Sequence, residues 1–540
     1  MEKNKKLVTY ALPYANGPLH LGHMMGLVQS DCYVRAMRLM GEDIAFVCGD
    51  DAHGTPIMLN AQKKGITSEE LIQQIYTDHV ADLKSFHISV DGYYSTHEEL
   101  NTNIVHTVYK RLESQGDIRA QEINQAYDEK EGMFLPDRYI KGECPICSAP
   151  DQYGDHCEVC GKAYAIEELR SPKSIISGTE PVWKMSEHYL YTLSKKKEQV
   201  QSWLDKAILQ DSIKNKLEEW FVPDGQGSDM LKDWDISRDA PYFGIEIPGK
   251  ENKYFYVWLD APFGYMTALG LTLSLSKCED VFDAWNERQI VHFIGKDITY
   301  FHGVFWPSVL DSAGLKQPDQ LHVHGFLTMS GDKMSKSRGT FVAIKDCLAV
   351  FSSDMLRYYF ASRLSSGVTD VDLNWDDFKQ KINSDLVGKF VNIGSRSQGF
   401  LHKYFDGQLA SDVEEDVWGR IISKHQEISD AYTDNNLAQV CRLVMDMCDE
   451  TNQYIDQEKP WVLAKSNELE RLHVVTTTAM NLFRYVATML SPIVPSLVEG
   501  AQESFGDEDV SWMPSLLLGK KVKHFDHLVS RVTDEDLSAL

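Results

Sequence analysis

An alternation of strand-like and helix-like segments at the start of the chain constrains its fold most strongly. The apolar run from Leu7 to Leu12 is rich in strand-forming residues, and it is followed by the turn residues Pro13 and Gly17 and a helical pattern to about Met40. A second apolar run, from Asp43 to Cys48, again precedes a helical stretch. Strands that alternate with helices predict an α/β domain with a parallel sheet, whose ligands bind beyond the carboxyl ends of the strands.

The alternation is interrupted in the middle of the chain. Between about Glu113 and Leu231 the sequence breaks into short strand-like pieces, a group of cysteines and a charged stretch with several Trp and Tyr residues. The α/β pattern resumes at Tyr254, and from about Ser384 onward periodic segments are typical of amphipathic helices. Because 540 residues exceed what one core supports, the sequence predicts an α/β domain split by an insertion and followed by a helical domain.

The composition is that of an ordinary globular chain without a membrane segment. Hydrophobic residues make up 43% of the chain and charged residues 25%, so there is enough apolar surface for several cores. The N-terminus lacks an apolar stretch of signal-peptide length, and no run of about 18 apolar residues occurs. We therefore expect a cytoplasmic protein with no membrane partner.

The formal net charge of −26 does not favour a nucleic-acid partner, because phosphate binding requires Lys and Arg. A local basic face is sufficient for such binding, however, and one stretch qualifies. An ordinary solvated helix face is the alternative interpretation. Apart from Asp385 the stretch is cationic, with Lys379, Lys381, Lys389, Arg396 and Lys403.

Four of the ten cysteines form two Cys-x2-Cys pairs, Cys144 with Cys147 and Cys157 with Cys160. Each pair supplies two thiolates from one tight turn, as tetrahedral zinc coordination with Zn–S bonds of about 2.3 Å requires. Four thiolates leave no open position for water, so the spacing predicts one structural Zn²⁺. His156 lies between the pairs, but the cysteines already complete the ligand set.

Two histidines follow the first expected strand, in Pro18–His23. At a helix start His20 and His23 share one face, where they can donate to phosphate oxygens beside the free N–H groups of the first turn. Gly22 lets a nucleotide approach the backbone closely. A histidine pair satisfied by local hydrogen bonds is the alternative.

The second chemical motif is Gly331–Gly339, a short loop that carries Lys333, Lys336 and Arg338 between glycines. Cations that close over a triphosphate can stabilise the charge that develops on a leaving pyrophosphate. A solvated basic turn is the alternative. The chain contains no GxxxxGK[ST] sequence, so a P-loop does not bind the phosphates.

Together, HLGH after the first strand and KMSKS more than 300 residues later resemble the paired signatures of the class I aminoacyl-tRNA synthetases. The segments ALPYANGPLHLGH, GDDAHGTP, DWDISRDAPYFG, YVWLDAPFGY, HFIGKDITYFH and KMSKSRGT are similar to the methionine-specific branch in order and spacing. The resemblance implies a methionine–tRNA ligase that forms methionyl-adenylate and pyrophosphate from L-methionine and ATP. It would then transfer methionine to the 3′ end of tRNA(Met), with Mg²⁺ accompanying ATP.

The resemblance also implies roles for the residues of both signatures. ATP would be bound by His20, Gly22, His23 and Lys336. The catalytic groups would be His20 and His23, which hold the phosphates, together with Lys333 and Lys336, which stabilise the transition state. The methionine carboxylate is itself the nucleophile, so no general base is required.

For the amino acid, Asp51 resembles the residue that pairs with the α-ammonium. Aromatic edges from Trp258 and Tyr265 suit a polarisable thioether, although core packing would also explain both side chains. Asp297 and Arg238 are further candidates without an assigned role. The rest of the implied methionine pocket comprises Ala11, Leu12, Tyr14, Ala261, Pro262, Ile298 and His302.

Asn392 and Arg396 lie four residues apart on one expected helix face and resemble the anticodon readers of the family, joined by Trp461. Bases of nucleotide loops are read by stacking on aromatic faces and by hydrogen bonds to their edges. The chain stops soon after the helical region, so we expect a monomer.

The fold class implied is α/β, with a Rossmann-type parallel-sheet catalytic domain split by a zinc-binding insertion and followed by an α-helical anticodon-binding domain. The expected divisions are the first catalytic half at 1–115, the connective insertion at 116–230, the second catalytic half at 231–325, the KMSKS and stem-contact region at 326–385, and the anticodon-binding domain at 386–540.

Two alternatives stay open. A related synthetase for leucine, isoleucine, valine or cysteine shares both signatures, but editing members need a larger insertion and the cysteine enzyme uses a catalytic zinc. A catalytically silent tRNA-binding paralogue would keep the fold without the chemistry, which the intact His20, His23, Lys333 and Lys336 argue against.

Overall fold

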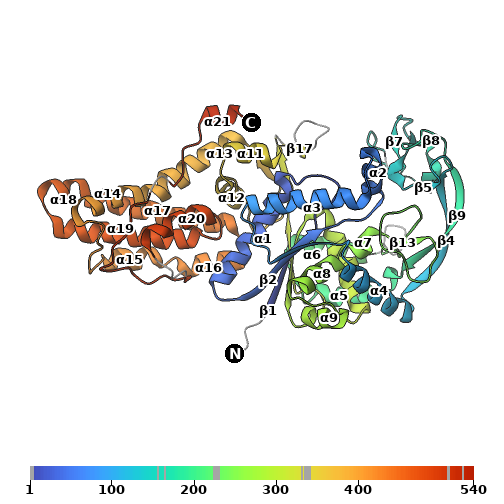
Figure 1. Cartoon of the computed structure of the whole chain (residues 1–540), viewed down its shortest axis with the longest axis horizontal. Coiled ribbons are helices and arrows are strands. Elements are labelled where there is room, and N and C mark those ends of the chain that lie inside the picture. The colour runs from blue at the N-terminus through green and yellow to red at the C-terminus, as the bar shows by residue number, and fades with distance from the viewer. Residues whose placement is uncertain are drawn as a thin grey trace.

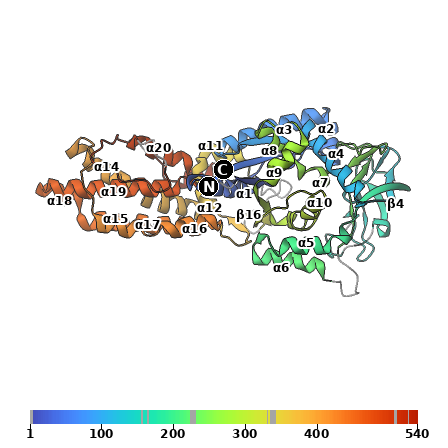
Figure 2. The same cartoon turned by 90° about the horizontal axis from the view of Figure 1, so that it is seen from below.

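The computed structural model describes residues 5–154, 157–162, 164, 166–222, 231–329, 342–506, 511–525 and 528–540, and the backbone of 332–333. The chain forms an elongated body with three parts (Figure 1). A parallel sheet and its helices occupy the middle, strands β4 and β9 stand at one end, and helices α14 to α20 form the other end. A view from below shows the same order (Figure 2).

The central sheet has six strands in the order β10-β15-β14-β1-β2-β3, and every neighbouring pair is parallel. In this order β1 has β2 and β3 on one side and β14 and β15 on the other. The strand order therefore changes direction between β1 and β14, although the strands are parallel. Loops part at such a point and leave a crevice beyond the carboxyl ends of the two strands. The strands are β1 (Lys5–Tyr10), β2 (Asp43–Asp50), β3 (Gly92–Ser95), β10 (Ile208–Leu209), β14 (Gln289–Gly295) and β15 (Gln320–His324).

Both faces of the sheet are covered, which explains why its strands read as continuous apolar runs. Successive side chains alternate between faces, so Val8 packs with α1 while Leu7 packs with α4 and α8 on the other side. The core on the α1 side continues into the C-terminal helices without a break. The covering helices are α1 (Leu21–Leu39), α2 (Thr55–Lys64), α3 (Ser68–Ser85), α4 (Glu99–Ser114), α7 (Val257–Asp260), α8 (Phe263–Thr272), α9 (Cys278–Asn286) and α10 (Trp306–Ser312).

The insertion contains two small antiparallel sheets, with strand orders β11-β9-β4-β5 and β7-β6-β8. The second sheet carries the cysteine pairs in its connecting turns. The strands are β4 (Ile118–Asp128), β5 (Met133–Phe134), β6 (Ile140–Glu143), β7 (Gln152–Tyr153), β8 (Arg170–Ser174), β9 (Val182–Tyr191) and β11 (Trp234–Asp235). Short helices α5 (Lys197–Leu204) and α6 (Asp211–Glu218) lead back to the central sheet.

The C-terminal part is helical, and the predicted fold class is confirmed. Its central helix α19 is almost wholly buried among the others. Within the described part of the chain, no helix is long and apolar enough to cross a membrane. The helices are α11 (Ile344–Val350), α12 (Ser353–Ala361), α13 (Trp375–Lys381), a π-helical segment (Ile382–Val391), α14 (Asn392–Phe405), α15 (Glu415–Ile422), α16 (His425–Thr433), α17 (Leu437–Glu458), α18 (Pro460–Ser466), α19 (Leu469–Leu490), α20 (Pro495–Phe505) and α21 (Asp534–Ser538).

A buried ion pair joins the sheet domain to the helical part. Arg357 of α12 donates to Asp31 of α1 at 2.7 Å, and neither side chain is exposed. The same guanidinium donates to the backbone carbonyls of Phe86, Pro492 and Ile493. One side chain therefore links α1, the end of α3 and the turn after α19.

Candidate active site

A cavity of about 710 Å³ opens at the carboxyl ends of β1 and β14, where the sheet reverses. Segments far apart in the sequence surround it, namely the residues after β1, the start of α1, α7 and the start of α8, and the residues after β14 and β15. Every described residue that the sequence assigned to ATP or methionine lines this cavity: Ala11, Leu12, Tyr14, His20, Gly22, His23, Asp51, Trp258, Ala261, Pro262, Tyr265, Ile298 and His302.

The two histidines of the first motif stand at the N-terminus of α1. His20 is the N-cap, and its Nδ1 accepts a hydrogen bond from the backbone N–H of Gly22 at 3.0 Å. The Nδ1 of His23 accepts from the backbone N–H of His20 at 3.2 Å, and the two rings stack with centroids 3.8 Å apart. Because both Nδ1 atoms accept, the neutral rings carry hydrogen on Nε2. Each Nε2–H is thus a donor beside the positive end of the helix.

Asp51 follows β2 and forms an isolated parallel bridge with Tyr14. Its Oδ1 is buried and accepts no hydrogen bond from the described residues. Burial, together with the charges of Asp260 and Asp50, raises the pKa of Asp51 well above its usual range. A cation that enters the cavity and pairs with this carboxylate stabilises its ionised form.

Tyr265 and His302 form a neutral, hydrogen-bonded pair at the cavity wall. The Nδ1 of His302 lies 3.2 Å from the carbonyl oxygen of Ile298, which can only accept, so Nδ1 carries the hydrogen. The Tyr265 hydroxyl therefore donates to Nε2 of His302, 2.9 Å away. Burial lowers the pKa of His302 to about 4, so the ring is neutral at physiological pH. The wall suits an apolar, polarisable group.

The aromatic wall is wider than the sequence indicated. Trp258 is 37% exposed, which excludes the core-packing interpretation for it, and its ring meets Phe301 edge-on at 5.4 Å. Tyr242, Tyr256 and Phe301 also line the cavity, and none of them was singled out from the sequence. All three lie inside segments quoted for the family resemblance. Their position in those segments is the sequence signal that could have identified them.

Arg238 and Asp297, to which the sequence assigns no definite role, both line the cavity. Arg238 lies with its guanidinium 3.9 Å from the centroid of the Tyr256 ring and donates to Asp235 at 3.3 Å. Among the described lining residues it is the single Lys or Arg.

The predicted lysines of the second motif lie largely outside the described residues. Lys333 is described only as backbone, in β17 (Asp332–Lys333), where it pairs with Thr328 of β16 (Leu327–Met329). Lys336 lies outside the described residues. Because Leu327 lines the cavity, β16 runs from the cavity wall directly toward the motif.

The four predicted zinc ligands come together in the insertion. Their sulfur atoms lie within 4.8 Å of one another, with Cys144 and Cys160 3.9 Å apart and Cys147 and Cys157 3.5 Å apart. A zinc ion with four Zn–S bonds of about 2.3 Å places its sulfurs about 3.8 Å apart, so the cluster fits this ion. Backbone N–H groups within each turn also donate to Cys144 and Cys157, as in a preformed thiolate site.

The three predicted anticodon readers lie on two helices of the C-terminal part. Arg396 of α14 lies over the ring of Trp461 of α18, 5.4 Å from its centroid, and pairs with Asp456. Trp461 is 38% exposed. Asn392 donates to the side chain of Asn452 at 3.0 Å, so its amide is engaged within the protein.

Comparisons with known proteins agree with this architecture. A family model described as tRNA synthetases class I (M) matches residues 6–398, and one described as the anticodon binding domain of methionyl tRNA ligase matches residues 406–540. Among solved structures, Mycobacterium tuberculosis methionyl-tRNA synthetase in complex with methionyl-adenylate aligns with a TM-score of 0.81 at 22% identity, covering 97% of this chain and 99% of that chain. The apo form of the Mycobacterium tuberculosis enzyme aligns with a TM-score of 0.74 at 19% identity, over 98% and 99% of the two chains.

Proposed function

Since the chain belongs to the methionine-specific class I tRNA synthetases, we propose that the cavity at the sheet reversal is where it activates methionine. It is a ligase that joins L-methionine to AMP with release of pyrophosphate and then charges a tRNA. One observation carries the assignment of this reaction to the cavity: a carboxylate with an unpartnered buried oxygen, an apolar aromatic wall and two histidine donors line the same space.

The methionine end of the site is proposed to be the pocket around Asp51. The ammonium group of methionine supplies the cation that the buried Oδ1 lacks. The thioether then lies against Trp258, Tyr265 and His302. Tyr265 donates to His302, and His302 donates to the carbonyl of Ile298, so both donors are engaged. Their contact with sulfur is therefore through ring surfaces.

The phosphate end is proposed to be the start of α1. The Nε2–H groups of His20 and His23 donate to ATP phosphate oxygens, and the helix N-terminus adds favourable charge. Gly22 leaves room for the nucleotide. Arg238 faces the anionic groups between the two ends, the methionine carboxylate and the α-phosphate. Lys333 and Lys336 are proposed to stabilise the leaving pyrophosphate, and Mg²⁺ accompanies ATP.

The chemistry needs no general base. A carboxylate oxygen of methionine attacks the α-phosphorus, the bond to the bridging oxygen breaks, and pyrophosphate leaves with its electron pair. A terminal tRNA hydroxyl then attacks the methionine carbonyl, AMP leaves, and the hydroxyl proton passes to a phosphate oxygen. Positioning and charge stabilisation supply most of the catalysis.

Outside the cavity, we assign one structural Zn²⁺ to the four cysteines, which hold it through sulfur alone. Anticodon reading is assigned to Asn392, Arg396 and Trp461, with tRNA(Met) as the partner. We propose that the active form of the protein is a monomer in the cytoplasm.

The test is amino-acid-dependent ATP–pyrophosphate exchange, with leucine, isoleucine and cysteine as controls. Exchange with methionine alone supports the assignment, and Lys336→Ala should abolish it while methionine still binds. Exchange with another amino acid would refute the pocket assignment, and exchange with none would favour the silent tRNA-binding paralogue.

A further inference from the structure

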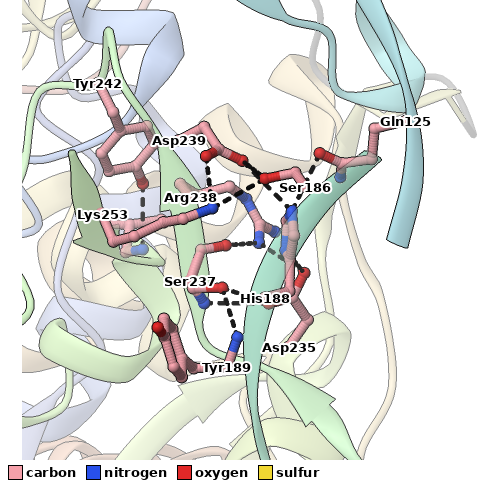
Figure 3. A network of polar contacts seen from close by, with 11 residues as sticks. Gln125, Ser186, His188, Tyr189, Asp235, Ser237, Arg238, Asp239, Tyr242 and Lys253 are labelled. Carbon is pink, nitrogen blue, oxygen red and sulfur yellow. Dashed lines mark hydrogen bonds and ion pairs between the residues drawn. The ribbon is translucent and has the colours of Figure 1, made fainter. Parts of the chain in front are cut away.

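A polar network joins the zinc-bearing insertion to the wall of the cavity (Figure 3). His188 of β9 lies at its centre, between Gln125 of β4 and the segment that follows β11. We call the side chains of His188, Asp235, Arg238, Asp239 and Lys253 the His188 network. Strands β12 (Ser237–Asp239) and β13 (Lys253–Phe255) carry its last three members, and Arg238 connects it to the cavity.

Both nitrogens of the His188 ring face acceptors. Nδ1 lies 2.7 Å from Oδ2 of Asp235, and Nε2 lies 3.1 Å from Oε1 of Gln125 and 3.4 Å from Oδ2 of Asp239. A neutral imidazole carries one N–H and cannot donate to Asp235 and Asp239 together, so a carboxylate at each nitrogen favours the doubly protonated ring. His188 is 1% exposed, which makes it a buried cation.

The titration behaviour of these groups is consistent with that protonation. Burial by itself lowers the pKa of His188, but hydrogen bonds to Asp235 and Asp239 raise it above its usual value overall. Burial of Asp239 is outweighed by donors from His188, Lys253 and Ser186, which lower the pKa of Asp239 to about 2. The pKa of Asp235 is lowered as well, mainly by the hydrogen bond from His188.

The charge balance of the network depends on His188. Lys253 donates to Asp239 at 2.5 Å, and Arg238 donates to Asp235 at 3.3 Å. Without the His188 proton, the two carboxylates and two cations would cancel, and Arg238 would pair with Asp235, its one ion-pair partner among the described residues. Protonated His188 is a third cation, and it also pairs with Asp235. Asp235 therefore neutralises less of the charge on Arg238, and that charge remains directed at the cavity.

We propose that protonated His188 is a positioning residue for methionine activation, which neutralises Asp235 and thereby keeps Arg238 available to the methionine carboxylate. This inference rests on the proposed function. His188 lies on the insertion and does not line the cavity, whereas Arg238 does, so His188 acts through Arg238.

A comparison of methionine binding with methioninol binding separates the contact with the substrate carboxylate from the other contacts in the pocket. Methioninol keeps the ammonium and thioether groups but has a hydroxymethyl group in place of the carboxylate. In His188→Gln, which keeps a donor to Asp235 but no charge, methionine binding should weaken about tenfold, as expected for one charge-assisted contact. Methioninol binding should stay within about twofold. The matched control is His106→Gln on α4, whose ring hydrogen-bonds to the carbonyl of Glu246 outside the cavity; both affinities should be unchanged.

A double-mutant cycle with Arg238→Met tests the route of the effect. If His188 acts through Arg238, then His188→Gln adds no further loss of methionine affinity in the Arg238→Met background. Additive losses would overturn the proposal and indicate a general structural role for His188. A loss of methioninol affinity equal to that of methionine would overturn it as well.

The wild-type protein gives a second measurement that does not depend on whether a variant folds. Among the described residues, the titratable groups that face His188 are Asp235 and Asp239, which also pair with Arg238 and Lys253, and both carboxylates are ionised at neutral pH. As pH rises from 6.5 through the raised pKa of His188, methionine affinity relative to methioninol affinity should therefore fall. A ratio that stays constant through the pH range in which His188 loses its proton would overturn the proposal. If wild-type protein bound neither ligand, the proposed function itself would fail.

Discussion

Asp51 occupies a site that is unfavourable for a carboxylate until a substrate arrives. Its pKa is raised by burial and by two neighbouring aspartates, and its Oδ1 has no partner among the described residues. For an acid whose folded-state pKa lies above the ordinary value, ionisation at neutral pH costs stability. A residue kept in such a place is a candidate for binding a cation, since strained polar groups gather at functional sites.

Asp51→Asn should therefore separate stability from activity. We expect the KM for methionine in exchange to rise about 100-fold, because a buried charge-assisted contact is lost, while the KM for ATP changes little. The free energy of unfolding at pH 7 should increase by about 1 kcal/mol, since the uncompensated charge is removed. Steady-state exchange and urea titration measure the two effects, and a lowered stability with unchanged methionine KM would contradict this interpretation.

Three buried histidines around the cavity predict a loss of stability in acid. Burial lowers the pKa of His292, His302 and His324, to about 4 in the case of His302. In the unfolded chain each takes up a proton near pH 6.5, so their contribution is fully present above pH 6.5 and is lost as pH falls toward 4. Each histidine contributes up to about 1.4 kcal/mol per pH unit to the pH dependence of the free energy of unfolding.

The variant His302→Gln tests this slope by urea unfolding between pH 7 and 4.5. It removes one titrating group, so the pH dependence of its unfolding free energy should be shallower than that of the wild type by about 1.4 kcal/mol per pH unit. An unchanged slope would show that His302 is protonated in the folded protein.

Residue types near a recognisable sequence signature were predictable, and residues defined only by long-range folding were not. The ATP and methionine residues could be assigned because each lies in a short distinctive segment. Tyr242 and Tyr256 also lie in such segments, but nothing there distinguishes them from core aromatics, and β12, β13 and α7 bring them to the cavity. The ionisation of Asp51 and His302 likewise depends on burial, which a sequence pattern does not specify.

Helix α1 begins with a residue that has two functions. His20 caps the helix through its Nδ1, and its ring is also the proposed phosphate donor. Asn is among the best N-cap residues but cannot place a donor where Nε2 lies. His20→Asn should thus keep the free energy of unfolding within about 0.5 kcal/mol of the wild type and reduce exchange about 100-fold, whereas His20→Ala should also lose about 1 kcal/mol. Thermal unfolding and ATP–pyrophosphate exchange, measured on both variants, test this prediction. Equal stability of the two variants would refute the capping role of His20.

The sheet β7-β6-β8, which carries the proposed zinc site, supports part of the cavity wall. Pro136, Asp137 and Tyr139 line the cavity, and backbone hydrogen bonds join Asp137 to Gly154 and Tyr139 to Ile175 in the zinc-bearing region. Cys147→Ser should lower bound zinc below one ion per chain, speed amide hydrogen exchange in β6 to β8 but not in β1, and reduce methionine-dependent exchange. Cys278→Ser, a cysteine outside the cluster, is the control. Full activity of metal-free protein would contradict this coupling.

The order of elements followed from periodicity, but the pairing of strands did not. The sequence predicted strands and helices in alternation, the insertion, and the helical end. It did not predict that β10, a two-residue strand within the insertion expected at 116–230, completes the edge of the central sheet beside β15. Such pairing depends on the return path of the insertion rather than on local composition.

Across the whole molecule, two functions are assigned to opposite parts of a continuous core. The cavity lies at the sheet, Trp461 and Arg396 lie on α18 and α14, and the Arg357–Asp31 pair connects the two parts. Trp461→Ala should lower kcat/KM for tRNA charging about 10- to 100-fold, the range of one lost base stack, with exchange unchanged. Val462→Ala, its exposed neighbour, should change neither. Equal loss of charging and exchange would instead indicate a fold defect.

The most direct test of the account is a single-turnover experiment on the wild-type protein. Protein with bound zinc is mixed with ATP, Mg²⁺ and labelled methionine, passed rapidly through a desalting column, and then mixed with tRNA(Met). We expect close to one methionyl-adenylate per cavity before the tRNA is added and transfer of the label to tRNA afterwards. Failure to retain adenylate, with both substrates bound, would contradict the assignment of methionine activation to this cavity.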